Sequence, residues 1–213
     1  MFIAPHEWLP PPQTSPDASP LHLPDTRSFD HAGLYRKLTT AQPGAAARDE
    51  AAQFLHRQLA QVAEQPADLP DAPESLGQWM ATAAQSVHSY YSRYVEQRKL
   101  GQPRRFFTNR AHALYFLRNV APSKLVVGSW LYGVLPHWRH AHFSDLVRTY
   151  VEELGEGAPD KNHVLLYRKL LARHGLDPLD DLPDALYQQG LVQLALGWNA
   201  EHFLPGVIGF NLA

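Results

Sequence analysis

The segment SDLVRTYVEELGEGAPDKNHVLLYRKLLARHGLD, residues 144–177, decides the fold because it predicts two helices joined by a sharp break. Apolar residues recur at helical spacing before and after the glycine-rich stretch 155–159, which interrupts the pattern. We expect helices over residues 144–154 and 160–174, the second ending at Gly175 as helices with a glycine C-cap do. Two helices around such a break are typical of a helical bundle.

The rest of the chain shows the same helical spacing, and no stretch alternates apolar and polar residues over the length of a strand. The sequence therefore predicts an all-α helical bundle over residues 28–213, preceded by a proline-rich extended leader over residues 1–27. Further helices are expected at 45–65, 76–99, 108–120, 123–135 and 183–199, with one starting at Pro205 and a short one that Ser28 caps and that carries Leu34, Tyr35 and Leu38.

Two of these helices carry specific expectations. The helix over residues 123–135 is apolar on most sides, so we expect it to be buried and to end at Pro136. Gly128 and Gly133 within it would let a neighbouring backbone come close. The tyrosines of the helix over residues 76–99 recur at a spacing that suits a face of the core.

Composition limits the classes of function. The chain has 213 residues, of which 45% are hydrophobic, enough for a core of ordinary size. Its 19 basic and 21 acidic residues nearly balance, so no overall field points to nucleic acid or to an acidic membrane as a partner. The absence of cysteine excludes disulfides, iron–sulfur clusters and thiolate zinc sites. A metal would need the 12 histidines and carboxylates, ligands that suit iron, zinc or manganese.

The sequence predicts a soluble, cytoplasmic protein. The N-terminus lacks the basic and apolar regions of a signal peptide. The longest apolar stretch, residues 125–135, is too short for a membrane span, which needs about 20 residues.

Glu153 and His163 are the candidate metal ligands, one on each side of the break. On one straight helix they would lie about 15 Å apart along the axis and could not share an ion. The break lets Glu153 end one helix and His163 begin the next, with both head groups directed inward. Glu152 is an adjacent carboxylate that points about 100° away. The alternative interpretation is a solvated junction between two helices at the surface.

The order of residue types in this segment is more specific than the spacing between Glu153 and His163. It runs from Glu153 to Asp177 as Glu-Leu-Gly-x-Gly, a histidine six residues later, an apolar helix and Gly-Leu-Asp. With Val120-Ala121-Pro122, Gly128-Ser129-Trp130-Leu131, Phe203-Leu204-Pro205 and Gly209-Phe210-Asn211-Leu212, it resembles the haem-oxygenase-like di-metal oxidases, the iron-containing redox enzymes. The resemblance covers residues 106–213.

The resemblance implies a bundle whose core holds two iron ions and uses O₂ to oxidise a small organic substrate. Glu153 and His163 match the first Glu and His ligands of the family. The later ligands, a further Glu and a His-x-x-x-Asp motif followed by another His, have no counterpart here, and Glu201 is expected at a helix N-terminus instead. We therefore expect this chain to be the N-terminal part of the domain, incomplete at its C-terminus, with part of the ligand set and no activity alone.

Two other groups of residues allow more than one interpretation. His137, His140 and His142 could bind zinc or nickel, but a polar loop after Pro136 is the simpler interpretation. Basic and aromatic residues alternate over residues 90–110, which could stack nucleic-acid bases, but a core face beside a solvated turn explains them as well. The alternative function is a metal-free helical module that binds a ligand or a protein, and a homodimer is left open.

Overall fold

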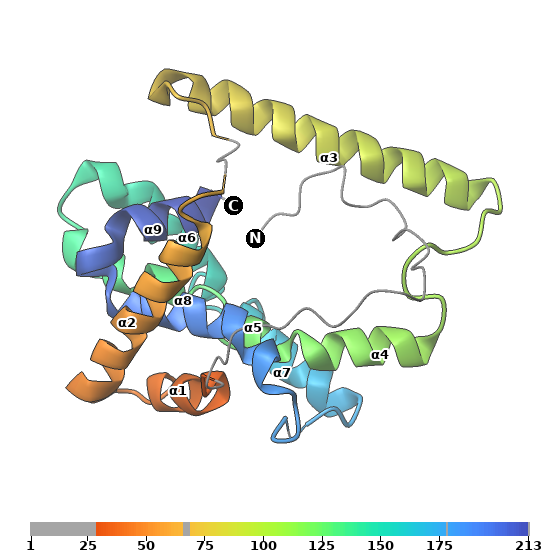
Figure 1. Ribbon diagram of the computed structural model, residues 1–213. Coiled ribbons are helices and arrows are strands. Elements are labelled where there is room, and N and C mark those ends of the chain that lie inside the picture. Colours follow the sequence, from red (N-terminus) through yellow and green to blue (C-terminus); the bar gives the residue numbers. More distant parts are fainter. Residues whose placement is uncertain (1–28, 66–68, 178, 213) are drawn as a thin grey trace, which may run out of the picture.

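The computed structural model describes residues 29–65, 69–177 and 179–212, and the predicted proline-rich leader lies outside them. Within these ranges all regular structure is helical and no strand occurs, as predicted for an all-α bundle (Figure 1). The α-helices are α1 His31–Leu38, α2 Ala45–Val62, α3 Leu76–Lys99, α4 Arg110–Asn119, α5 Ala121–Lys124, α6 Ser144–Glu153, α7 His163–Arg173, α8 Gln188–Trp198 and α9 Ala200–Leu212. Four 3₁₀ helices join them: η2 Pro73–Ser75, η3 Ser129–His137, η4 Ala141–Phe143 and η5 Asp184–Tyr187.

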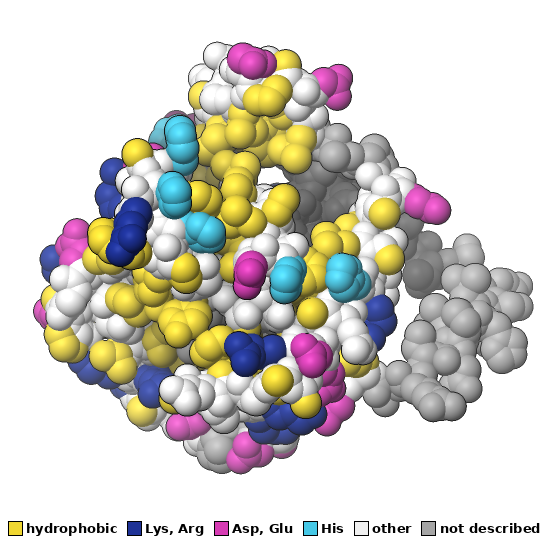
Figure 2. All heavy atoms as spheres, turned by 90° about the vertical axis from the view of Figure 1, so that its left-hand side faces the viewer, with side chains coloured by type: hydrophobic (Ala, Val, Ile, Leu, Met, Phe, Trp, Pro, Cys, Tyr) yellow, Lys and Arg dark blue, Asp and Glu magenta, His cyan; other side chains and the backbone are white. Residues whose placement is uncertain are grey.

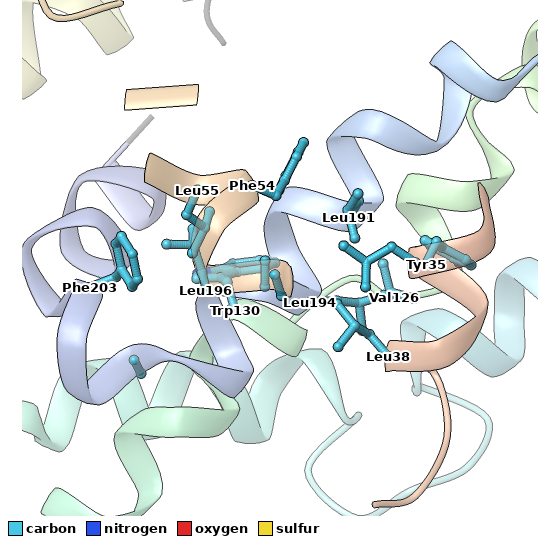
Figure 3. Packing of buried hydrophobic residues seen from close by; sticks show 14 of the residues in the cluster. Tyr35, Leu38, Phe54, Leu55, Val126, Trp130, Leu191, Leu194, Leu196 and Phe203 are labelled. Carbon is cyan, nitrogen blue, oxygen red and sulfur yellow. The ribbon is translucent and has the colours of Figure 1, made fainter. Parts of the chain in front are cut away.

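Helix α8 is the centre of the bundle. It lies against α1, α2, α5, α9 and η3, and most of its residues are buried. Leu191 is fully buried, and Figure 3 shows it beside side chains contributed by α1, α2 and η3. A helix that is apolar on nearly every side must be covered by neighbours on nearly every side, and α8 is.

Glycines bring the backbones around α8 unusually close. A Cβ atom on Gly197 would lie 2.0 Å from the carbonyl oxygen of Ser129, and one on Gly190 would lie 2.5 Å from that of Pro122. Across the same interface, a Cβ on Gly133 would meet the carbonyl oxygen of Gly197 at 2.5 Å. The predicted close approach of a backbone at Gly133 is therefore confirmed.

The predicted α-helix over residues 123–135 is wrong in its geometry, although its burial is correct. The chain forms the short helix α5 and then the 3₁₀ helix η3, with Gly128 between them at a φ of +85°. That left-handed conformation cannot continue an α-helix, and a glycine adopts it without strain. Pro136 lies inside η3 and does not end it.

The N-terminal helix is capped by Asp30, whose side chain accepts a hydrogen bond from the amide of Gly33. The predicted cap, Ser28, lies outside the described residues. The helix is tied to η5 because Nδ1 of His31 lies 2.6 Å from Asp184 and the amide of Ala32 donates to the same carboxylate at 2.8 Å. This clasp joins segments that are far apart in the sequence.

Helix α3 has no buried residue, as is also true of α4 and α6. Its bounds are those predicted, but the prediction that its tyrosines face the core is wrong: Tyr90 and Tyr91 are 53% and 65% exposed. In Figure 1 the helix runs apart from the bundle, which it joins through α4 at its C-terminal end. None of the described helices combines the length and the hydropathy that a membrane span requires.

Candidate metal centre

The junction between α6 and α7 is built by a glycine cap. The amide of Gly155 donates to the carbonyl of Glu152 and the amide of Glu156 donates to that of Val151, both at 2.9 Å. These two bonds form a Schellman motif, which closes the C-terminus of a helix and turns the chain away. Gly155, Glu156 and Gly157 all have positive φ angles, so the predicted break is confirmed as a run of left-handed residues.

Asn162 holds the two helix ends together. Its side-chain oxygen caps α7 by accepting a hydrogen bond from the amide of Leu165 at 3.0 Å, and its amide nitrogen donates to the carbonyl of Leu154 at 3.3 Å. A Cβ atom on Gly155 would lie 2.5 Å from the Asn162 backbone nitrogen, so the turn also depends on the absence of a side chain there. Sequence reasoning missed Asn162, although an Asn directly before a helix is a known N-cap signal.

The turn brings the two predicted ligands into direct contact. Glu153 is the last residue of α6 and His163 is the first residue of α7, and Oε2 of the carboxylate lies 2.5 Å from Nδ1 of the imidazole. The predicted juxtaposition of these side chains is confirmed. The donor and acceptor roles in this contact depend on the imidazole tautomer. With the ring proton on Nε2, Nδ1 has a free lone pair, so Nδ1 and Oε2 are the two atoms that one cation would take as ligands.

The two side chains differ in burial. The Glu153 side chain is 19% exposed, whereas that of His163 is 53% exposed. The prediction that both head groups point into the core is therefore wrong for His163, because the first residue of α7 lies at the rim of the bundle. The structure thus combines features of both interpretations: a paired acid and imidazole, at a junction that is open to solvent on one side.

Gly128 forms the inner wall of the pair. A Cβ atom at this position would lie 2.9 Å from Cβ and 3.3 Å from Cγ of Glu153. The sequence predicted a close approach of a backbone here, but the group that approaches is the Glu153 side chain. The missing side chain at Gly128 gives the carboxylate its partly buried place.

The other ion pairs described near the junction join neighbouring charged side chains and do not involve Glu153 or His163. Glu152 is 56% exposed and lies 3.8 Å from Arg148 one turn earlier, so it points away from the pair as predicted. Lys161 lies 3.7 Å from Glu156 across the turn.

Burial raises the pKa of Tyr150 on α6, with a smaller contribution from Tyr132, and burial also raises the pKa of Tyr167 on α7. Both phenols therefore stay neutral near pH 7.

Among the described residues, the other histidine cluster forms no group of three side chains that could hold a metal. His137 ends η3 with its ring stacked on Phe143, and His140 and His142 are exposed. The rings of His137 and His140 are 6.4 Å apart between centroids. This geometry favours the loop interpretation. Glu201 lies in the first turn of α9, as predicted.

The donor set of the α6–α7 junction fits part of an iron site. One carboxylate and one imidazole are the ligand types that ferrous iron takes in non-haem proteins. Among the described residues, however, no group of three or more His, Asp or Glu side chains gathers in a way that could hold a metal. The pair therefore fits iron as two ligands, and it does not form a complete site.

The fold and this pair can now be compared with known proteins. Residues 114–213 match the model of the family described as iron-containing redox enzymes. Over these residues, which include the whole α6–α7 junction, the chain is similar to that family, and the match confirms the resemblance drawn from the sequence. No curated protein and no solved structure matches the chain.

Proposed function

We propose that Glu153 and His163 are protein ligands of a non-haem iron centre in an O₂-dependent oxidoreductase that acts on a small organic molecule. The observation that carries the proposal is the 2.5 Å contact between these two side chains inside the matched region. The description of the family supports iron and redox chemistry, and the non-haem di-iron centre, O₂ and the substrate class belong to the proposal.

Each residue has a separate role. The Glu153 carboxylate supplies negative charge toward a cation and, because Gly128 leaves room for it, does so from a partly buried position. His163 supplies a neutral nitrogen ligand from the first turn of α7, the helix that Asn162 caps. Iron, when bound, supplies the ability to bind and reduce O₂. Further ligands are needed for two ions, so this chain alone is expected to hold iron weakly and to show no turnover.

The alternative, a metal-free ligand-binding module, would need a well-formed pocket. A groove lined by Leu55, Leu59, Val192, Leu196 and Phe203 has a volume of about 190 Å³. Sites for small molecules commonly measure about 300–1,000 Å³. The groove is therefore small for a ligand site, and it does not include Glu153 or His163.

Anaerobic calorimetric titration with Fe(II) tests the proposal. We expect Glu153→Ala and His163→Ala each to weaken iron binding by at least about tenfold, since loss of even a supporting group near a metal costs that much. Glu152→Ala is the matched control for the acid and His174→Ala for the imidazole, and both should bind as the wild type does. Equal binding by all five proteins would favour the metal-free module.

A further inference from the structure

The apolar side chains of α3 form a regular stripe whose middle the described residues leave exposed. At its ends Leu76 and Tyr94 are partly buried, and the ring of Tyr94 lies against that of Phe106. Six residues recur at alternating spacings of four and three: Leu76, Met80, Ala83, Val87, Tyr90 and Tyr94. We call them the α3 seam. This 4–3 repeat is the pattern of a helix that packs along a second helix by inserting side chains between those of its partner.

The side chains in the middle of the seam are exposed to solvent. Met80, Val87 and Tyr90 are 42%, 58% and 53% exposed, and the flanking Tyr91 is 65% exposed. The opposite face of α3 carries Gln78, Thr82, Gln85, Ser89 and Ser92. A helix with one apolar face and one uncharged polar face is stable when a second apolar surface covers the first.

The distribution of charge along and directly before α3 indicates which kind of partner would fit the seam. The exposed acids Asp71 and Glu74 precede α3, whose own first turn has no acidic residue, and no basic residue lies between positions 69 and 80. The C-terminal end, residues 93–105, carries five basic residues and one acidic residue. Figure 2 looks toward the N-terminal end of α3 at the top of the molecule, where acidic side chains project outward and hydrophobic ones line the underside. Acidic residues therefore precede α3, and basic residues gather at its C-terminal end.

We propose that α3 is an interaction surface for a second copy of this chain, and that the two α3 helices pair antiparallel about a two-fold axis. An antiparallel pair sets the acidic segment before each helix beside the basic end of the other helix, whereas a parallel pair sets the two basic ends together. The helix dipoles oppose each other in the same arrangement. A two-fold axis uses one self-complementary face and closes the assembly at two copies.

The side chains of the seam fit this arrangement. With the axis between Ala83 and Val87, Ala83 of one copy faces Val87 of the other, Met80 faces Tyr90, and Leu76 faces Tyr94. Each layer joins a smaller residue to a larger one, and the two central Ala83–Val87 layers are the smallest, so the two helices can approach most closely at the axis. The pairing is independent of the metal proposal, because α3 lies outside the region that matches the redox family.

Light scattering after size-exclusion chromatography of the full chain tests the pairing. We expect a mass of twice the 24.0 kDa of one chain for the wild type. Val87→Glu places an acid in both central layers and should give the mass of one chain. Gln85→Glu adds the same charge on the opposite face of α3 and should stay dimeric. A wild type that elutes as a single chain at tens of micromolar protein, or a dimeric Val87→Glu variant, overturns the proposal.

Two controls keep this test decisive. Val87 is exposed within the chain, so the Val87→Glu variant should retain the helical circular dichroism of the wild type. Because the chain has no cysteine, the orientation can be read from disulfides formed under mild oxidation between single-cysteine variants. A mixture of Met80→Cys and Tyr90→Cys should cross-link into mixed dimers, and Met80→Cys alone should not. Self-linking of Met80→Cys would overturn the antiparallel arrangement.

Discussion

Helices α3 and α8 differ both in composition and in surroundings, since α8 has no charged residue and α3 carries three basic residues and one acidic residue. Both contain glycine and aromatic residues, but α8 is buried on nearly every side, whereas α3 has no buried residue. The difference lies in the distribution of the apolar residues: they surround α8 and form one stripe on α3. A stripe indicates that one face will be covered, but it does not tell which surface covers it. The chain's own helices cover α8, and we assign the α3 stripe to a second copy.

The largest difference in stability is expected between two leucine-to-alanine variants, one within α8 and one directly after the last residue of α3. Leu191→Ala on α8 should lower the free energy of unfolding by about 2–5 kcal/mol, because it opens a cavity in the centre of the core. Leu100→Ala at the end of α3 removes a side chain that is 83% exposed and should change it by less than about 0.5 kcal/mol. Urea denaturation followed by circular dichroism measures both. Equal losses would contradict the assignment of α8 as the centre of the fold.

Glycine replacements sharpen the same comparison. Gly197→Ala on α8 forces a methyl group against the Ser129 carbonyl and should destabilise the fold by about 1–3 kcal/mol. Gly77→Ala on α3 meets no atom within 4 Å and should stabilise its helix by roughly 0.5 kcal/mol. Thermal unfolding should therefore move in opposite directions for the two variants. A neutral Gly197→Ala would mean that the backbones of α8 and η3 are farther apart than described.

A smaller, pH-dependent effect is expected where α1 is clasped to η5. Partial burial raises the pKa of Asp184, but hydrogen bonds from Ala32 and His31 outweigh it and hold that pKa below its ordinary value of 3.8. A carboxyl whose pKa is lower in the folded chain stabilises the fold above pH 3.8 and loses that contribution as the pH falls through the lowered value.

Asp184→Asn tests this sign. Because the carboxylate is 43% exposed, we expect a loss of only about 1 kcal/mol at pH 7, and the difference from the wild type should shrink below pH 4. Denaturant titrations at pH 7 and pH 3 give both values. Asp180→Asn, which changes an exposed acid in the same loop, should show no such difference. A loss that grows at low pH would reverse the argument.

Local signals in the sequence predicted most of the helices. Bounds were closest where a breaker is explicit, as at Gly101-Gln102-Pro103 after α3 and at Gly175 after α7, whose predicted cap is formed by bonds from Gly175 and Leu176. The error over residues 123–135 has a physical cause: apolar content does not distinguish an α-helix from a 3₁₀ helix, and Gly128 was assigned to close packing when it also reverses the backbone.

Local signals in the sequence also predicted the contact between Glu153 and His163, but they did not predict how exposed it is. The break between α6 and α7 follows from Gly155 and Gly157, and it suffices to bring Glu153 to His163. The exposure of His163 did not follow, because it depends on where α7 begins relative to the rest of the bundle. The clasp of His31 and Asp184 had no local signal at all, since only the tertiary fold brings α1 and η5 together.

The central claim is that Glu153 and His163 hold iron, and direct detection of the imidazole tests it best. With protein in excess over Fe(II), the nitric oxide adduct can be studied by electron spin echo envelope modulation, which detects a directly bound histidine nitrogen. We predict that this nitrogen modulation is present in the wild type and in His174→Ala and absent in His163→Ala. The same modulation in His163→Ala, or none in the wild type, would contradict the account.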